Sequence, residues 1–145
     1  MFFFGHIAIS LCLADATESD RTAAVAGNLL PDVVDKTGGW VLKVMPSARW
    51  LAHGLPCFSL LSGLALLLLD RRRARGFILG YAGHLVADLW AGGRVPWFAP
   101  FERHKQRPPG KKTRSGLALY FLPEAVGLPV IALLLRKEKT GAPNQ

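Results

Sequence analysis

The sequence predicts an all-α fold, a small multi-pass membrane bundle of about four principal helices. Half of the 145 residues are hydrophobic, and they are clustered rather than spread evenly. Three stretches carry at most two histidine, acidic or basic side chains each, namely residues 55–69, 77–91 and 117–135. A helix needs roughly 17–25 apolar residues to cross a bilayer, and the first two stretches lie at or below the short end of that range. We therefore expect one membrane-embedded domain over residues 1–136 and a polar tail over 137–145.

Positive charge flanks these apolar stretches. The net charge is +8, and the basic side chains form blocks at residues 71–75, 103–114 and 136–139. Such juxtamembrane blocks meet anionic lipid headgroups, so membrane lipids are the expected partners. Aromatic side chains interleaved with the bases, which single-stranded nucleic acid would require, are missing from the blocks, so no nucleic-acid partner is expected. The two cysteines, Cys12 and Cys57, form no CxxC pair and predict no disulfide framework or thiolate site.

Residues 1–16 allow two interpretations. A signal peptide has an apolar core and a small-x-small cleavage site, which Ala14-Asp15-Ala16 resembles. However, no basic segment precedes the apolar core, and His6 interrupts it. We favour a retained, mostly buried first helix.

The next segments follow from capping and proline chemistry. Asp20 is a good N-cap for a helix over residues 22–30. The residue before a proline avoids the α region, so Pro31 should end or kink this helix near Leu30. Residues 40–45 predict a short amphipathic piece at the membrane interface.

The second half of the chain alternates apolar spans with basic connections. Polar residues 49–54 lead into the span 55–69, and residues 71–75 predict a tight basic turn into a helix over 76–92. A loop rich in proline and basic residues follows over 94–115. The last span, 117–135, should be kinked at Pro123 and Pro129.

The helix predicted over residues 76–92 carries two potential metal ligands. His84 and Asp88 are four residues apart, so on a helix they converge on one point. They continue a ridge of small residues spaced four apart, formed by Gly76, Gly80 and Gly92. The opposite side, which should face outward, carries Ile78, Leu79, Leu85, Val86 and Leu89.

Six ionisable groups recur near apolar elements: His6, Asp32, Asp35, His53, His84 and Asp88. Such groups are costly at membrane depth, which makes them functional candidates. Neutral imidazoles and carboxylates are ligands that suit zinc, with manganese or iron as alternatives. Simpler explanations stay open for each residue. His84 and Asp88 could hydrogen-bond each other, and Asp32 could form a helix cap or turn.

Four short motifs occur in a recognisable order: Gly5-His6, Ala26-Gly27-Asn28-Leu29-Leu30-Pro31-Asp32-Val33-Val34-Asp35, Arg49-x-x-x-His53 and Gly80-Tyr81-x-x-His84-x-x-x-Asp88. Together they resemble the YdjM-like family, described as membrane-bound, metal-dependent hydrolases, over roughly residues 5–101. A fainter resemblance exists to zinc-dependent phospholipase C, an all-helical enzyme with histidine and aspartate ligands. The chain departs from the family motifs at Ala48, Ala52, Gly54 and Gly83.

The resemblance implies a metal-dependent hydrolase of the bacterial inner membrane, acting on a lipid-related ester or phosphoester. The expected ligands are His6, Asp32, His53, His84 and Asp88. Asp35 is expected to be a ligand or the general base, and Arg49 to pair with an anionic phosphate. The alternative is a non-enzymatic membrane protein in which the cluster is a structural metal site or a packing network. Transport of metal ions or protons is a weaker hypothesis, because four short helices offer little pathway for an ion unless the protein oligomerises.

Overall fold

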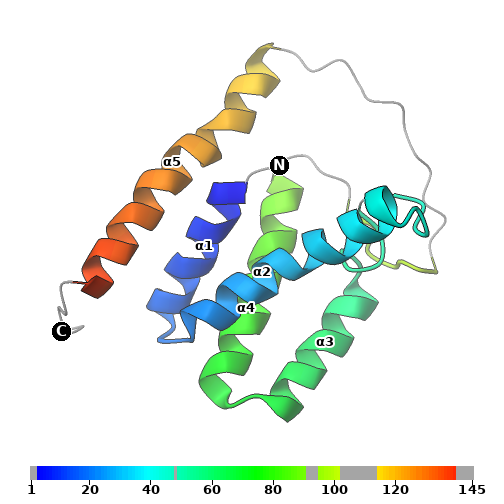
Figure 1. Ribbon diagram of the computed structural model, residues 1–145, viewed down its shortest axis with the longest axis horizontal. Helices are drawn as coiled ribbons and strands as arrows, with labels where there is room; N and C mark the ends of the chain where they lie inside the picture. Colours follow the sequence, from blue (N-terminus) through cyan, green and yellow to red (C-terminus); the bar gives the residue numbers. More distant parts are fainter. Residues whose placement is uncertain (1–2, 48, 91–94, 102–113, 140–145) are drawn as a thin grey trace.

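The computed structural model describes residues 3–47, 49–90, 95–101 and 114–139, with the backbone alone for 114–123 and 137–139. These residues form five α-helices and a short π-helix, and no strand occurs among them (Figure 1). The predicted all-α class is confirmed, with one helix more than the four expected. The elements are α1 (Phe3–Ala16), α2 (Arg21–Lys36), η1 (Thr37–Val41), α3 (Leu55–Leu68), α4 (Arg71–Trp90) and α5 (Arg114–Lys139).

Helices α2 and α4 cross in direct backbone contact. A Cβ added to Gly80 would lie 2.7 Å from the carbonyl carbon of Ala24, and one added to Gly27 would lie 2.9 Å from that of Phe77. Each helix therefore needs a glycine where the other helix passes. This close crossing brings the C-terminal half of α2 towards the face of α4 that carries His84 and Asp88.

Helix α2 is longer than predicted. The Asp20 carboxylate caps it by accepting the N–H of Ala23 at 2.7 Å, but the helix then continues through Pro31 to Lys36. Of the two predicted outcomes at Pro31, an end or a kink near Leu30, the end is therefore wrong. Proline removes one backbone hydrogen bond but keeps a helical φ, and tertiary packing can offset a cost of about 3 kcal/mol. Pro31 is fully buried, which indicates that this packing supplies the compensation.

The basic residues 71–75 are the first turns of α4 rather than a separate turn. The Asp70 carboxylate accepts the backbone N–H groups of Arg72 at 3.0 Å and Arg73 at 3.1 Å, and so starts the helix five residues earlier than expected. Helix α3 ends at Leu68, close to the predicted end of its span. The two helices form a hairpin, visible at the bottom of Figure 1.

Helix α1 lies between α4 and α5 (Figure 1). At the start of α1, the Glu124 carboxylate of α5 accepts the N–H of Phe4 at 2.9 Å. It thereby satisfies one of the backbone N–H groups that have no partner within the helix. A Cβ on Gly127 would lie 2.6 Å from the carbonyl carbon of Phe4, so α5 also approaches α1 closely. Helix α5 is continuous through both prolines and includes residues 137–139, which were expected in the tail.

The interior of the bundle is polar where the helices meet. The largest fully buried side chains include Tyr81, His53, His84, Asn28 and Asp35, whereas the buried apolar cluster is small. Leu85 was expected to face outward but is buried in that cluster, while Val86 and Leu89 are exposed as predicted. The predicted amphipathic piece is partly the π-helix η1, whose Trp40 and Val41 are exposed.

The predicted membrane spans are not confirmed among the residues that the structure describes. Helix α3 has 14 residues and is thus ~21 Å long, shorter than a hydrocarbon core of about 30 Å. Over the described part of the chain, none of the helices combines the length and the hydropathy that a membrane crossing requires.

Candidate metal centre

His84 and Asp88 lie one turn apart on the buried face of α4, with 2% and 1% of their surfaces exposed. His84 Nε2 and Asp88 Oδ2 are 3.8 Å apart, which is too long for a hydrogen bond. The predicted convergence of the two side chains is therefore present, but the hydrogen bond that would explain it more simply is not. Both side chains point their ligand atoms at groups from other helices.

His53 is held in place by Asp35. Its Nδ1 lies 2.6 Å from Asp35 Oδ2, and both side chains are fully buried. The same carboxylate accepts the backbone N–H groups of Trp50 at 2.6 Å, Ala52 at 2.9 Å and His53 at 3.3 Å. Asp35 thus fixes both the imidazole and the loop that carries it. With Nδ1–H donating to the carboxylate, the lone pair of Nε2 is left for a ligand.

Two other ligand candidates, Asp32 and His84, converge on His53. Its Nε2 lies 3.2 Å from Nε2 of His84 and 3.7 Å from Oδ1 of Asp32, and the latter two atoms are 4.0 Å apart. Ligand atoms of a tetrahedral zinc ion, each 2.0–2.1 Å from the metal, lie about 3.3 Å from one another. Asp32, His53 and His84 therefore have the spacing of a site that needs only a small contraction to hold a cation.

A second group shares His84 with the first. His6, His84 and Asp88 place one ligand atom each within 4.8 Å of one another. Asp88 joins the two groups, because its Oδ1 is 3.5 Å from His6 Nε2 and its Oδ2 is 3.4 Å from His53 Nε2. Five side chains from α1, α2, α4 and the loop before α3 thus form one continuous cluster of nitrogen and oxygen ligands.

The donor set fits a divalent cation. Asp32 Oδ1, His84 Nδ1 and Asp88 Oδ2 are buried and make no hydrogen bond within the described residues. Buried polar atoms without partners are costly, and buried charge is tolerated when it coordinates a metal. A cation in the cluster would satisfy the two carboxylate oxygens with ligand chemistry that suits zinc.

Two cations of the chain itself border the cluster. Arg49 Nη2 lies 2.8 Å from Asp88 Oδ1, and Lys36 forms an ion pair with Asp32 one turn earlier on α2. Arg49 is partly exposed, with 31% of its side chain accessible, so the cluster meets solvent on this side. The arrangement puts a guanidinium at the rim, where an anionic group could approach.

The buried contacts shift the pKa values of the His53–Asp35 pair in opposite directions. Burial by itself lowers the pKa of the His53 imidazole, but hydrogen bonds and charge from Asp35 and Asp88 outweigh it and raise that pKa above 6.5. Burial likewise opposes ionisation of Asp35, yet the hydrogen bonds from His53, Ala52 and Trp50 keep its pKa below 3.8. In the metal-free protein these contacts favour the imidazolium of His53 and the carboxylate of Asp35, so a metal ion competes with a proton for Nε2.

The structure brings all seven predicted site residues together. His6, Asp32, His53, His84 and Asp88 supply the clustered ligand atoms, Arg49 is at the rim, and Asp35 lies behind His53. Asp35 belongs to neither three-residue group, so the geometry favours a positioning role for it over direct ligation.

Sequence reasoning missed two supporting residues. Asn28 is fully buried and donates through Nδ2 to the backbone oxygens of His6 at 3.1 Å and Gly80 at 3.3 Å, which ties α1, α2 and α4 together. The Tyr81 hydroxyl donates to the carbonyl of Ala52 at 2.5 Å beside His53. Both residues lie inside the sequence motifs described above. The signal that could have identified them is a polar side chain among apolar neighbours in a predicted helix.

The order of these motifs along the chain is that of a known family. The sequence profile of the YdjM inner membrane protein family matches residues 1–142. The chain belongs to this family. The name of the family, inner membrane protein, agrees with the predicted membrane localisation. No curated protein and no solved structure matches the chain. Of the positions that depart from the family motifs, Ala52 serves through its backbone N–H and Ala48 lies outside the described residues.

Proposed function

We propose that this YdjM family member is a divalent-metal-dependent hydrolase of the bacterial inner membrane, acting on a lipid-related phosphoester or ester. The observation that carries the proposal is the cluster of five histidine and aspartate ligands, in which two three-residue groups share His84. A bound divalent cation, zinc being the first choice and manganese or iron the alternatives, would supply Lewis-acid polarisation of the scissile group.

The protein's own residues would prepare the site. Asp35 would hold His53 in the tautomer that presents Nε2 to the cluster, and this orientation is set by the 2.6 Å contact to Nδ1. Arg49 would bind the anionic group of the substrate at the partly exposed rim, because a guanidinium donates two parallel hydrogen bonds to a phosphate. The contact with Asp88 would keep the Arg49 side chain in place before substrate arrives.

One observation favours a second candidate function. Arg49 and Lys36 already neutralise Asp88 and Asp32, so the cluster could persist as an internal ion-pair network. The protein would then be a non-enzymatic membrane component with a structural metal site or packing network. Hydrolytic activity separates this candidate from the first.

The test is hydrolysis of a panel of lipid phosphoesters and carboxylic esters by the metal-reconstituted full-length protein. We expect turnover that chelation abolishes, and a rise in KM of about tenfold or more for Arg49→Ala on a phosphoester, since a hydrogen bond to a charged group contributes about 1.5–3 kcal/mol. Arg73→Ala is the matched control, because Arg73 is an exposed arginine on α4 whose ion pair is with the likewise exposed Asp70. Stoichiometric metal without turnover on any substrate of the panel would favour the structural candidate.

A further inference from the structure

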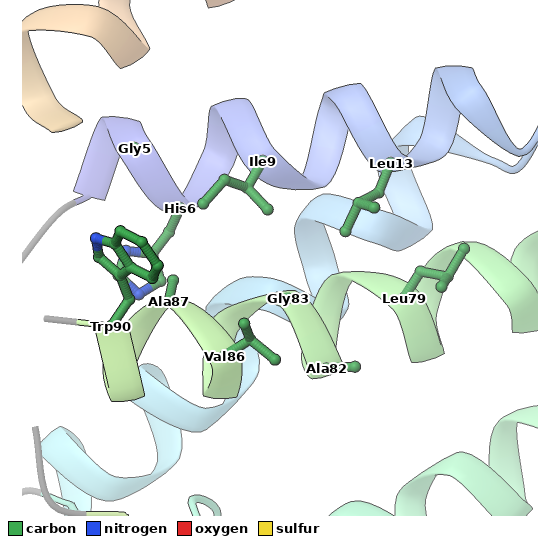
Figure 2. A pocket seen from close by; sticks show the side chains of 10 residues that line it. All are labelled: Gly5, His6, Ile9, Leu13, Leu79, Ala82, Gly83, Val86, Ala87 and Trp90. Atoms are coloured by element: carbon green, nitrogen blue, oxygen red, sulfur yellow. The ribbon is translucent and has the colours of Figure 1, made fainter.

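An apolar groove lies between α1 and α4, beside the candidate metal centre. Its volume is about 580 Å³, and nine of the ten described residues that line it are apolar or glycine, the tenth being His6. Figure 2 shows His6, Ala87 and Trp90 together at one end, and Leu13 and Leu79 at the other. From Leu79 to Trp90 the wall follows eleven helical steps, or ~16 Å. The groove is therefore elongated along the two helices.

A glycine lines the groove where α1 and α4 approach each other. A Cβ on Gly83 would lie 3.2 Å from Cδ1 of Leu13 and 3.4 Å from Cγ2 of Ile9, so a side chain there would press against the α1 wall of the groove. The rim residues Val86 and Trp90 are largely exposed. An apolar groove with an open rim suits a slender apolar ligand that enters from the side.

One end of the groove is continuous with the ligand cluster. His6 lines the groove, and its Nε2 lies 3.5 Å from Asp88 Oδ1, which also contacts Arg49. A molecule with its apolar part in the groove would therefore place its polar end near His6, Asp88 and the guanidinium of Arg49. The Arg49 guanidinium carries five N–H donors, one of which, on Nη2, reaches Asp88, and hydrogen bonds from the others favour an anionic polar end.

From these contacts we infer that the groove binds one acyl chain of a lipid phosphoester and presents its phosphate to the ligand cluster. The inference rests on the proposed function for the reaction, but the binding step does not require it. The membership of an inner membrane protein family is consistent with such a ligand, because bilayer lipids supply both the chain and the anionic headgroup.

Binding can be measured without turnover. The probe is a single-chain glycerophosphate lipid with bromine on its acyl chain, kept below its critical micelle concentration and titrated into metal-free, full-length protein. Bromine quenches nearby indole fluorescence, and subtracting the signal of Trp90→Phe isolates the contribution of Trp90. We expect saturable quenching, with affinity rising about fourfold per added methylene until the chain fills the groove.

Ala82→Phe fills the groove and should weaken the binding at least tenfold. Ala132→Phe is the matched control, since Ala132 is exposed on α5 and does not line the groove, and it should bind like wild type. Val86→Phe, at an exposed lining position, gives a second blocking variant if Ala82→Phe fails to fold. Affinity that does not depend on chain length in wild type, or that neither folded blocking variant changes, would overturn the inference.

The outcomes separate this inference from the proposed hydrolase. Chain-length-dependent binding without hydrolysis by the metal-loaded protein keeps the groove assignment and removes the enzyme. Hydrolysis that is equally fast for short and long chains and insensitive to Ala82→Phe does the reverse. A dimer that Ala82→Phe dissociates, with lipid binding unchanged, would show that a second copy of the chain covers the groove and would also overturn the inference.

Discussion

Replacing Gly80 by alanine should open the crossing of α2 and α4 and damage the ligand cluster. The new Cβ would lie 2.7 Å from the carbonyl carbon of Ala24, and ordinary contact begins at 3.4 Å. The helices must therefore separate by at least about 0.7 Å (3.4 − 2.7) at this point, because the neighbour is rigid backbone. Overpacking of this kind typically destabilises a protein by about 1–3 kcal/mol.

The same separation is large for a metal site. Distances from a metal to its ligands are fixed to within about 0.2 Å, and Asp32 and His84 lie on the two helices that must move apart. We expect Gly80→Ala to lower the free energy of unfolding by at least ~1 kcal/mol and the metal affinity by at least tenfold.

The assays are chemical denaturation in detergent and calorimetric metal titration. Gly63→Ala is the control, because a Cβ at Gly63 on α3 meets nothing within 4 Å and alanine is the better helix former by about 1 kcal/mol. If Gly80→Ala were as stable as Gly63→Ala and bound metal like wild type, the close crossing would not position the cluster, and the reasoning would be refuted.

Three further predictions concern the residues around the cluster. Asp35→Asn should lower metal affinity about 10–100-fold by calorimetry, because it weakens the partner that orients His53, while Asp70→Asn at an exposed carboxylate should leave the affinity unchanged. The raised pKa of His53 means that, without metal, the ion pair with Asp35 stabilises the fold fully below pH 6.5 and loses that contribution as the pH rises through the raised pKa. Metal affinity should instead fall as the pH drops through the same pKa, because a proton then occupies the imidazole. If denaturation and metal titrations both showed no dependence on pH across this range, they would contradict the assignment. Glu124→Gln should lower stability by about 0.3–1 kcal/mol, because it removes the negative charge at the start of α1, and an unchanged melting temperature would show that the contact with Phe4 is not stabilising.

The α4 part of the candidate site was predictable from one helical period, whereas the residues from α1, α2 and the loop before α3 were predicted from their chemistry and from the order of the family motifs. Gly76, Gly80, His84 and Asp88 are spaced four apart, and this spacing puts them on one face of any helix. The structure buries all four on the side of α4 that meets α2. The ridge that predicted ligands therefore also predicted the packing face.

Other features depended on tertiary contacts that no local pattern contains. Helix α2 continues past Pro31 although proline chemistry predicts an end, because buried packing outweighs a local preference. The position of Asp35 behind His53 depends on three N–H groups from residues 50–53, a loop whose shape the sequence does not specify. Leu85 is apolar like Val86 beside it, and only the placement of the elements that pack on α4 decides which of the two is covered.

The metal content of the purified protein tests the central claim most directly. Full-length protein, saturated with zinc, manganese or iron and then freed of excess ion, would be analysed for metal beside His84→Ala, whose side chain belongs to both ligand groups. The account predicts at least one ion per chain in wild type and a loss of that ion in the variant. A folded wild-type protein that retains none of these metals would contradict it.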